Sequence, residues 1–190
     1  MIRTRCPHCR QKLEPGQRIH PHCIDDFAEA QAEKARRKAE KQARAEAKVQ
    51  RAETRRRKEA IKTIQKWKAE CQAIANRYAR VRDAKDGCIS CDKPATWGGQ
   101  WHGSHFRSVG AASAVRFNLW NIHKACSVCN HHLSGNIAGY RPKLIQKTGA
   151  EKVEWLESQN QLVKYDIDYL KRYKKEIGKR LKRLEARNAM

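Results

Sequence analysis

Two pairs of cysteines in this sequence have the spacing of a metal-binding site. Cys88-Ile-Ser-Cys91 and Cys126-Ser-Val-Cys129 form a C-x2-C…C-x2-C set, whose four thiolates can close a tetrahedral zinc site. A site with four protein ligands leaves zinc no open position for catalysis. The spacing therefore predicts a structural zinc ion.

A second set of zinc ligands is predicted near the N-terminus. Cys6-Pro-His-Cys9 is followed ten residues later by His20-Pro-His-Cys23, which is the layout of a small zinc ribbon or knuckle. A segment so short and so poor in apolar residues has little else around which to fold. We predict that the ligands are Cys6, Cys9, His20 and Cys23. His8 or His22 could take the place of His20.

The segment between and just after the C-x2-C pairs contains side chains that suit phosphodiester hydrolysis. This reaction needs a base for the attacking water and a cation that stabilises negative charge on the phosphorane and on the departing 3′ oxygen. His105 can hold and release a proton near neutral pH and would be the base. Asn130, directly after Cys129, would give an amide oxygen to Mg²⁺, a hard cation that prefers oxygen ligands.

These positions and the cysteine pairs together form a recognisable pattern. A histidine on a predicted strand, an asparagine five residues before the second C-x2-C pair (Asn121) and an asparagine directly after that pair resemble the HNH family of nucleases. The C-x2-C pairs and the Cys-Asn junction resemble the pattern of phage T4 endonuclease VII. The run GSHFRSVGAASAVRFNLWNIHKACSVCNHHLSGNIAGYR is similar to the NinG (Rap) recombination proteins of lambda-like phages, and the similarity covers about residues 86 to 157.

The resemblance implies a function. It implies a structure-specific DNA endonuclease that cuts branched recombination intermediates, Holliday junctions and D-loops, with Mg²⁺ or Mn²⁺ as the catalytic ion beside two structural zinc ions. Asn121 would hold the loop opposite His105 and help to orient its ring. The implied partners are branched double-stranded DNA and recombination proteins, in the cytoplasm of a host cell. Symmetric resolution of a junction would favour a homodimer.

One position departs from the HNH pattern. In most HNH proteins an Asp or His immediately precedes the catalytic histidine and binds the metal, but here that position is Ser104. On an extended strand residues 102 and 104 point to the same side, opposite to residue 105, so His102 is the best replacement ligand. Imidazole is a poorer ligand for Mg²⁺, which leaves Mn²⁺ or another divalent ion open. We expect His123, His131 and His132 to have surface or zinc-packing roles, with His131 the first exception because it adjoins Asn130.

The charge of the chain favours a polyanionic partner. Its 190 residues include 42 Lys and Arg against 20 Asp and Glu, a formal net charge of +22, and cations in such excess repel one another unless a polyanion neutralises them. Charge alone would equally suit a ribosomal-type protein. Four cations flank the predicted reaction site and could contact phosphates: Arg107, Arg116, Lys124 and Arg141. The sequence shows neither a run of about 18 apolar residues nor a signal peptide, so we expect no membrane partner.

Helix-forming residues surround the cysteine-rich segment and predict a mostly helical α+β fold. From Asp25 to about Asp86 no Pro or Gly interrupts them, which predicts one long basic helix that could form a coiled coil. Apolar stripes from Ile61 to Val81 and from Val163 to Leu184 have helical spacing, so we expect these helices to pack together, within one chain or between two. The predicted parts are a zinc knuckle or ribbon (1–25), the basic helix (26–86), a zinc-stapled ββα-metal (HNH) module (87–148) and a helical region (149–190).

Two other functions fit the same residues. One is an HNH nicking endonuclease without junction preference, and the other, of a different class, is a non-catalytic zinc-containing nucleic-acid-binding protein. The intact set of His105, Asn121 and Asn130 argues against the non-catalytic function, whereas Ser104 argues for it.

Overall fold

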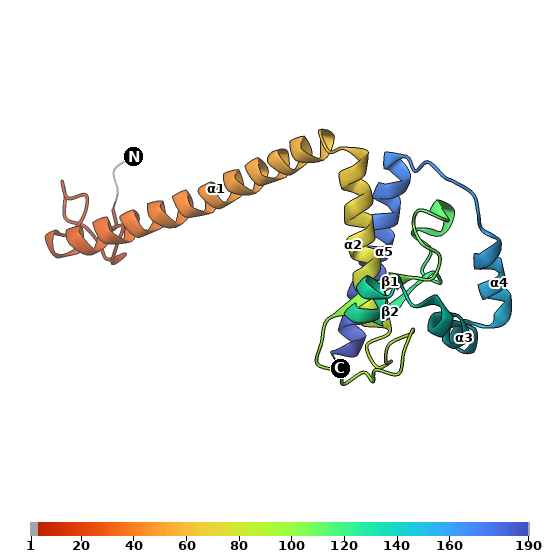
Figure 1. Ribbon diagram of the computed structural model, residues 1–190. Helices are drawn as coiled ribbons and strands as arrows, with labels where there is room; N and C mark the ends of the chain where they lie inside the picture. The colour runs from red at the N-terminus through yellow and green to blue at the C-terminus, as the bar shows by residue number, and fades with distance from the viewer. Residues whose placement is uncertain (1–3, 190) are drawn as a thin grey trace. The chain divides into compact units, whose positions relative to one another are not determined.

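The computed structural model describes residues 4–189 and divides the chain into two compact units, Met1–Ile61 and Lys62–Met190 (Figure 1). Within the described range the chain is mostly helical, with one antiparallel sheet of two strands. The predicted mostly helical α+β class is therefore confirmed. None of the helices in this range has the length and apolar character needed to cross a membrane.

The N-terminal unit consists of a cysteine-rich loop followed by a long helix. An isolated antiparallel bridge joins Arg5 to Lys12, and the 3-10 turn η1 (Pro21–Cys23) leads into α1 (Ile24–Ala60). α1 buries none of its 37 residues, because its alanines and charged side chains favour a helix without providing a large apolar face. Its exposed surface is supported locally by i,i+4 pairs such as Arg37 with Glu33.

The prediction of one helix over residues 26–86 is wrong, because the helix is interrupted at residues 61–63. α1 ends at Ala60, and α2 (Ile64–Arg82) begins after Thr63, whose side chain caps the new helix by accepting a hydrogen bond from the Lys66 N–H at 3.3 Å. Ile61 is 81% exposed and does not belong to the apolar stripe. The signal in the sequence is Thr63, since threonine is favoured at the residue before a helix.

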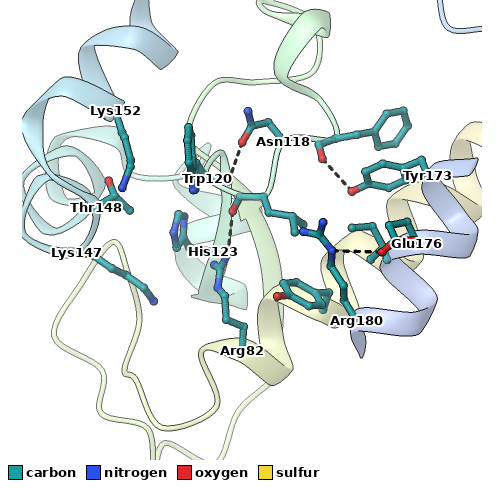
Figure 2. Close-up of a pocket in the computed structure, with 14 residues that line it drawn as sticks. Arg82, Asn118, Trp120, His123, Lys147, Thr148, Lys152, Tyr173, Glu176 and Arg180 are labelled. Atoms are coloured by element: carbon teal, nitrogen blue, oxygen red, sulfur yellow. Dashed lines mark hydrogen bonds and ion pairs between the residues drawn. The ribbon is translucent and has the colours of Figure 1, made fainter. Parts of the chain in front are cut away.

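In the second unit, α2 packs along α5 (Ile167–Asn188), which confirms the predicted pairing of these stripes within one chain (Figure 1). Cys71 is fully buried between them and donates its thiol to the Leu170 carbonyl at 3.2 Å. It therefore acts as a small buried apolar residue. Tyr173 of α5 donates its hydroxyl to the Phe117 carbonyl at 2.9 Å, which ties the loop before β2 to the helix pair (Figure 2).

The predicted C-terminal stripe begins too early. Val163 precedes α5 and is 41% exposed. The helix starts after Asp166, whose carboxylate caps it by accepting a hydrogen bond from the Tyr169 N–H at 2.6 Å. Residues on the stripe from Leu170 onward include the buried Ile177 and Leu181.

The sheet pairs β1 (Trp101–His105) with β2 (Ile122–Cys126), so that Trp101 faces Cys126 and His105 faces Ile122. One side of β1 lies directly against α2: a Cβ at Gly103 would come within 2.7 Å of the Asn76 Cα. Glycine is therefore required for this close approach. Trp97 and Phe106 lie outside β1.

Helical segments follow β2 and complete the second unit. They are a short π-helical turn, η3 (Val128–His132), and the helices α3 (Ile137–Thr148) and α4 (Ala150–Ser158); a 3-10 turn, η2 (Ser113–Val115), lies in the loop between the strands. α3 and α4 bury Tyr140, Leu144, Val153 and Leu156 in a common core with the cysteine-rich segment. This core fixes the segments that carry the two C-x2-C pairs.

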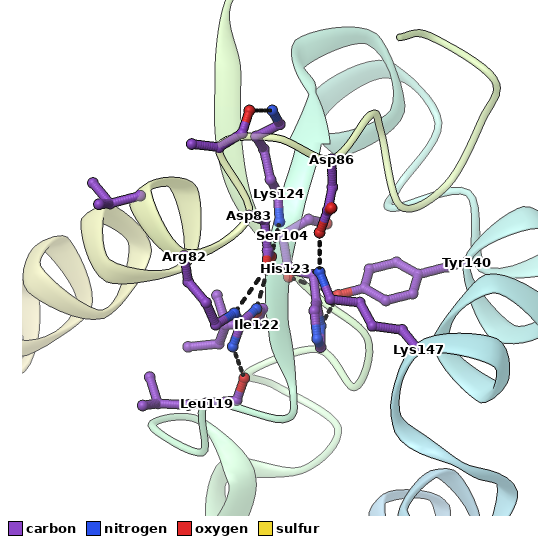
Figure 3. Close-up of polar contacts among 12 residues, drawn as sticks. Arg82, Asp83, Asp86, Ser104, Leu119, Ile122, His123, Lys124, Tyr140 and Lys147 are labelled. Carbon is purple, nitrogen blue, oxygen red and sulfur yellow. Dashed lines mark hydrogen bonds and ion pairs between the residues drawn. The ribbon is translucent and has the colours of Figure 1, made fainter. Parts of the chain in front are cut away.

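A buried ionic cluster joins the C-terminal end of α2 to β2 (Figure 3). Arg82 donates to the carbonyl oxygens of Leu119 and Ile122, both at 2.8 Å, and pairs with Asp83 at 2.7 Å. Asp83, only 2% exposed, also accepts from the Lys147 amine at 2.7 Å. Burial opposes the charged form of Asp83, but the hydrogen bonds and charges of Arg82 and Lys147 outweigh it and lower its pKa to about 2. The cluster therefore holds α2, α3 and the start of β2 in one arrangement.

Candidate metal and nucleic-acid site

The four cysteines of the C-x2-C pairs come together as predicted. The ligand atoms of Cys88, Cys91, Cys126 and Cys129 all lie within 4.8 Å of one another. The Cys91 and Cys126 sulfurs are 3.8 Å apart, close to the edge of about 3.8 Å that a tetrahedron with Zn–S bonds of about 2.3 Å would have. Backbone N–H groups of Cys126 and Ser90 point at the Cys88 sulfur, at 3.2 and 3.4 Å. Such donors stabilise thiolates, so the residues fit a structural zinc ion.

The N-terminal set also comes together, and the structure distinguishes between the histidines. The ligand atoms of Cys6, Cys9, His20 and Cys23 lie within 4.8 Å of one another. His20 directs its Nδ1 at the Cys9 sulfur, 3.3 Å away, while its Nε2 lies 3.2 Å from the Lys12 carbonyl oxygen. An imidazole that binds zinc through one nitrogen usually donates its other N–H to such an acceptor. His20, rather than His8 or His22, therefore belongs to the site.

His105 is the last residue of β1, and its ring is held by a backbone carbonyl. Its Nε2 lies 3.0 Å from the Arg116 carbonyl oxygen and 3.2 Å from the Gln72 amide nitrogen. A carbonyl oxygen can only accept, so we assign the proton to Nε2, which donates to the Arg116 carbonyl, and the lone pair to Nδ1. The Gln72 amide nitrogen, itself a donor, is then a neighbour of Nε2 and not its hydrogen-bond partner. Burial lowers the pKa of His105 below the ordinary histidine value. The ring is thus neutral near pH 7, with one defined tautomer.

Asn121 is fully buried at the other end of the loop that begins after His105. Its side-chain oxygen accepts from the Arg107 N–H at 2.7 Å, and its amide nitrogen donates to the carbonyls of Arg107 and Val115 at 3.0 and 3.1 Å. Its backbone carbonyl accepts from the Phe106 N–H at 2.9 Å. Asn121 therefore closes this loop, which also contains the Arg116 carbonyl.

His102, Asn130 and His131 form a second polar group. The Asn130 amide nitrogen lies 3.2 Å from the His102 Nδ1, and the rings of His102 and His131 meet edge to face with centroids 4.7 Å apart. Burial, with smaller contributions from the charges of His131 and Arg80, lowers the pKa of His102. Asn130 lies within the turn η3 one residue after Cys129, so the zinc-binding pair fixes its position.

The alternation of side chains along β1 places His105 on one face of the strand and His102, with its partners Asn130 and His131, on the other. His105 and Gly103 face α2, whereas His102 faces η3 and Ser104 is buried beneath the Gly135 turn. The Ser104 carbonyl accepts from the Tyr140 hydroxyl at 3.1 Å. His102 and Ser104 thus share a side of β1 opposite to His105, as the alternation of a strand requires.

A protein-family model described as Bacteriophage Lambda NinG protein matches residues 1–187. The chain belongs to the NinG family. Protein ninG of Escherichia phage lambda is 38% identical over 192 aligned residues, which cover 96% of this chain and 93% of that protein. Protein ninG of Salmonella phage P22 is 36% identical over 192 aligned residues, which cover 96% of this chain and 94% of that protein. No solved structure matches the chain.

The four cations predicted to contact DNA differ in their surroundings in this NinG-family chain. Lys124 is only 4% exposed, and its amine donates to the Ala84 carbonyl at 3.0 Å beneath the Trp101 ring. Lys124 therefore stabilises the fold and does not face solvent, because its position on β2 directs its side chain toward Ala84 just after α2. Arg141 pairs with Glu157 through two bonds of 2.8 and 3.0 Å. Arg107 and Arg116 are partly exposed and bond to neutral amides.

Several residues that shape the NinG site escaped the sequence patterns. Gln72 lies on α2 beside His105 and accepts from the Arg116 guanidinium at 3.1 Å. His123, expected at the surface or near zinc, is 2% exposed and lies 3.2 Å from the Tyr140 hydroxyl. Burial lowers the pKa of His123 to about 3, so it is neutral. Only its position in the apolar strand β2 could have indicated that it is buried.

Proposed function

We propose that this NinG-family chain is a metal-dependent DNA endonuclease of the HNH type that acts on branched DNA. The observation that carries the proposal is the state of His105, whose Nε2 proton is donated to the Arg116 carbonyl at 3.0 Å. A general base needs an unprotonated nitrogen at neutral pH, and Nδ1 of His105 meets this requirement. The lowered pKa of His105 keeps that nitrogen available.

The metal ligands in this proposal are His102, Asn130 and His131. His102 Nδ1 and the Asn130 amide are already neighbours at 3.2 Å, and rotating the amide by a half turn would present its oxygen to a cation beside that nitrogen. Two imidazoles and one amide oxygen suit Mn²⁺ better than Mg²⁺. The bound ion would stabilise negative charge on the scissile phosphate.

The choice of branched DNA as substrate rests on the resemblance and on charge. Formal net charge is +22, and the exposed cations of α1 can contact phosphates without reading bases. A protein that reads backbone shape rather than sequence can distinguish a junction from a linear duplex by the angle between its arms. The Cys88 set would serve to fix Asn130 relative to the sheet.

One observation favours the alternative, a zinc-containing protein that binds nucleic acid without cutting it. His102 and His105 leave opposite faces of β1, and three residues of extended strand separate their backbones by roughly 10 Å. To act on the same phosphate, a cation bound to His102 and a water bound to His105 would have to come together beyond the end of β1. Cleavage therefore has to be measured directly.

The test compares a four-way junction, a matched linear duplex and a single strand, each incubated with purified protein and with Mg²⁺, Mn²⁺ or no divalent ion. We expect cleavage of the junction that requires the ion and is fastest with Mn²⁺. Tight binding to all three without cleavage under any condition would reject the endonuclease and favour the non-catalytic alternative. Equal cleavage of junction and duplex would reject the branched-DNA preference alone.

A further inference from the structure

An exposed tryptophan stands at a hollow between α2, α5 and the loop before β2 (Figure 2). Trp120 is 47% exposed, and its ring meets the 43% exposed Trp155 edge to face, with centroids 6.2 Å apart. The hollow, called here the Trp120 groove, has a volume of about 710 Å³, in the range of sites that hold small molecules. Two neighbouring exposed indoles are a large apolar surface to leave in water and indicate a binding site.

The indole is held outward by a rigid loop. The Trp120 backbone N–H donates to the Asn118 side-chain oxygen at 2.8 Å. Arg82 donates hydrogen bonds to the Leu119 and Ile122 carbonyl oxygens, which precede and follow Trp120 in the chain, at 2.8 Å each. These bonds therefore fix the backbone of the loop that carries the exposed ring, which reduces the entropy lost when a ligand binds.

The groove is also positively charged. Its lining residues include four cations and one carboxylate, namely Arg82, Lys147, Lys152, Arg180 and Glu176. Arg82 and Lys147 are engaged by Asp83. Arg180 lies 3.9 Å from the Glu176 carboxylate. Lys152 lies on the opposite side of the hollow from Arg180, and its amine is 5.1 Å from the centre of the Trp120 ring (Figure 2).

An aromatic face with cations beside it matches a nucleotide. Bases stack on tryptophan whatever their sequence, and lysine or arginine can pair with the neighbouring phosphate. Within a duplex the base faces are already stacked on one another, so a protruding indole can reach only an unpaired base. A negatively charged protein patch would match the cations but would not need the indole.

We propose that the Trp120 groove binds an unpaired nucleotide of single-stranded DNA, with the base stacked on Trp120 and the phosphate paired with Lys152. The choice of DNA rests on the proposed function, since branched DNA exposes unpaired nucleotides at its branch point. The loop that carries Trp120 also carries the Arg116 carbonyl that holds His105. The groove and the candidate reaction site are therefore connected through one loop.

The test measures binding rather than cleavage, so it can succeed or fail independently of the nuclease. Affinity is determined for a labelled oligothymidylate and for a linear duplex, without added divalent ion, using the wild type and two Trp120 variants. Trp120→Ala should weaken oligothymidylate binding roughly 5- to 100-fold, the loss expected for one stacked base, and should change duplex binding less than about twofold. Trp120→Phe should retain most of the affinity.

A matched pair of charge variants tests the phosphate contact. Lys152→Gln and Lys182→Gln each remove one exposed cation, but only Lys152 lines the groove. Lys152→Gln should weaken oligothymidylate binding more than Lys182→Gln does. Thermal unfolding and zinc content confirm that each variant is folded.

Unchanged oligothymidylate binding by Trp120→Ala would overturn the inference and leave the groove to a protein partner. Equal losses for oligothymidylate and duplex would also overturn it, because the indole would then not select unpaired bases. If the protein cuts no DNA but the Trp120 variants behave as expected, the proposed nuclease fails and the groove assignment stands.

Discussion

At the scale of single residues, the Arg116 carbonyl decides which nitrogen of His105 can accept a proton. The position of His105 between the C-x2-C pairs is visible in the sequence, as is Asn130 beside Cys129. The partners of the ring are not, because the Arg116 carbonyl belongs to the backbone and Gln72 lies 33 residues away on another element. Spacing identifies the chemical groups, whereas the tautomer depends on the folded loop.

The pKa of His105 sets the pH dependence of the proposed cleavage. Burial lowers this pKa below the ordinary value of 6.5, and the neutral ring is the active form of a base. The single-turnover rate with saturating Mn²⁺ should therefore stay level from about pH 8 down to about 6.5 and fall only below that value. A rate that is already halved above pH 7 would mean that another group, with a higher pKa, limits the reaction.

The ligand assignment predicts how the metal requirement changes on mutation. His102→Ala and Asn130→Ala should each raise the Mn²⁺ concentration needed for half-maximal cleavage roughly tenfold or more, since each removes a direct ligand. His132→Ala is the control, because His132 is exposed and lies outside the His102, Asn130 and His131 group. A normal metal requirement in His102→Ala would mean that water or Ser104 occupies that coordination position.

At the scale of elements, apolar periodicity predicted correctly that α2 pairs with α5, but it predicted the first residue of each helix incorrectly. Periodicity reports which face of a helix is buried, whereas Thr63 and Asp166 decide where each helix begins. The short strand β1 could be placed only approximately, because the close contact between Gly103 and Asn76 depends on how α2 crosses the sheet.

The buried carboxylate of Asp83 should contribute strongly to the stability of the second unit. Asp83→Asn would leave Arg82 and Lys147 without their charged partner and should lower the free energy of unfolding by about 2–4 kcal/mol. Asp92→Asn is the control, since Asp92 is fully exposed beside Lys143 and should change stability far less than Asp83→Asn does. Urea unfolding at neutral pH measures both.

The pH dependence of the stabilisation by Asp83 follows from its pKa. Because the folded pKa is lowered from 3.8 to about 2, its contribution is complete above the unfolded value and is lost as the pH falls from about 3.8 toward 2. Equal stabilities of the Asp83→Asn and Asp92→Asn variants would contradict the role of the cluster.

At the scale of the whole molecule, the chain consists of two units, each with its own cluster of four Cys or His side chains that could hold a metal ion. The two clusters could be predicted because zinc ligands recur at fixed spacings. The division at residue 61 was missed, since the helix breaks without Pro or Gly and Thr63 is its only local signal. The low mean hydropathy of −0.92 leaves only small apolar cores, to which metal ions at the two clusters would add stability.

Two zinc ions per chain are expected by elemental analysis. Cys6→Ser should remove one ion while leaving the thermal unfolding of the second unit unchanged, because its ligands lie entirely in the first unit. Cys126→Ser should remove the other ion and destabilise the sheet, since Cys126 ends β2. About one zinc ion in the wild type, with no change in Cys6→Ser, would remove the N-terminal site.

The most direct test of the central claim is single-turnover cleavage of a four-way junction by His105→Ala at saturating Mn²⁺. The variant should bind the junction and retain zinc like the wild type, because His105 belongs to neither zinc-ligand set and to none of the cations proposed to contact DNA, and its cleavage rate should fall about 100-fold or more. Cleavage by His105→Ala at the wild-type rate would contradict the assignment of His105 as the base and, with it, the proposed active site.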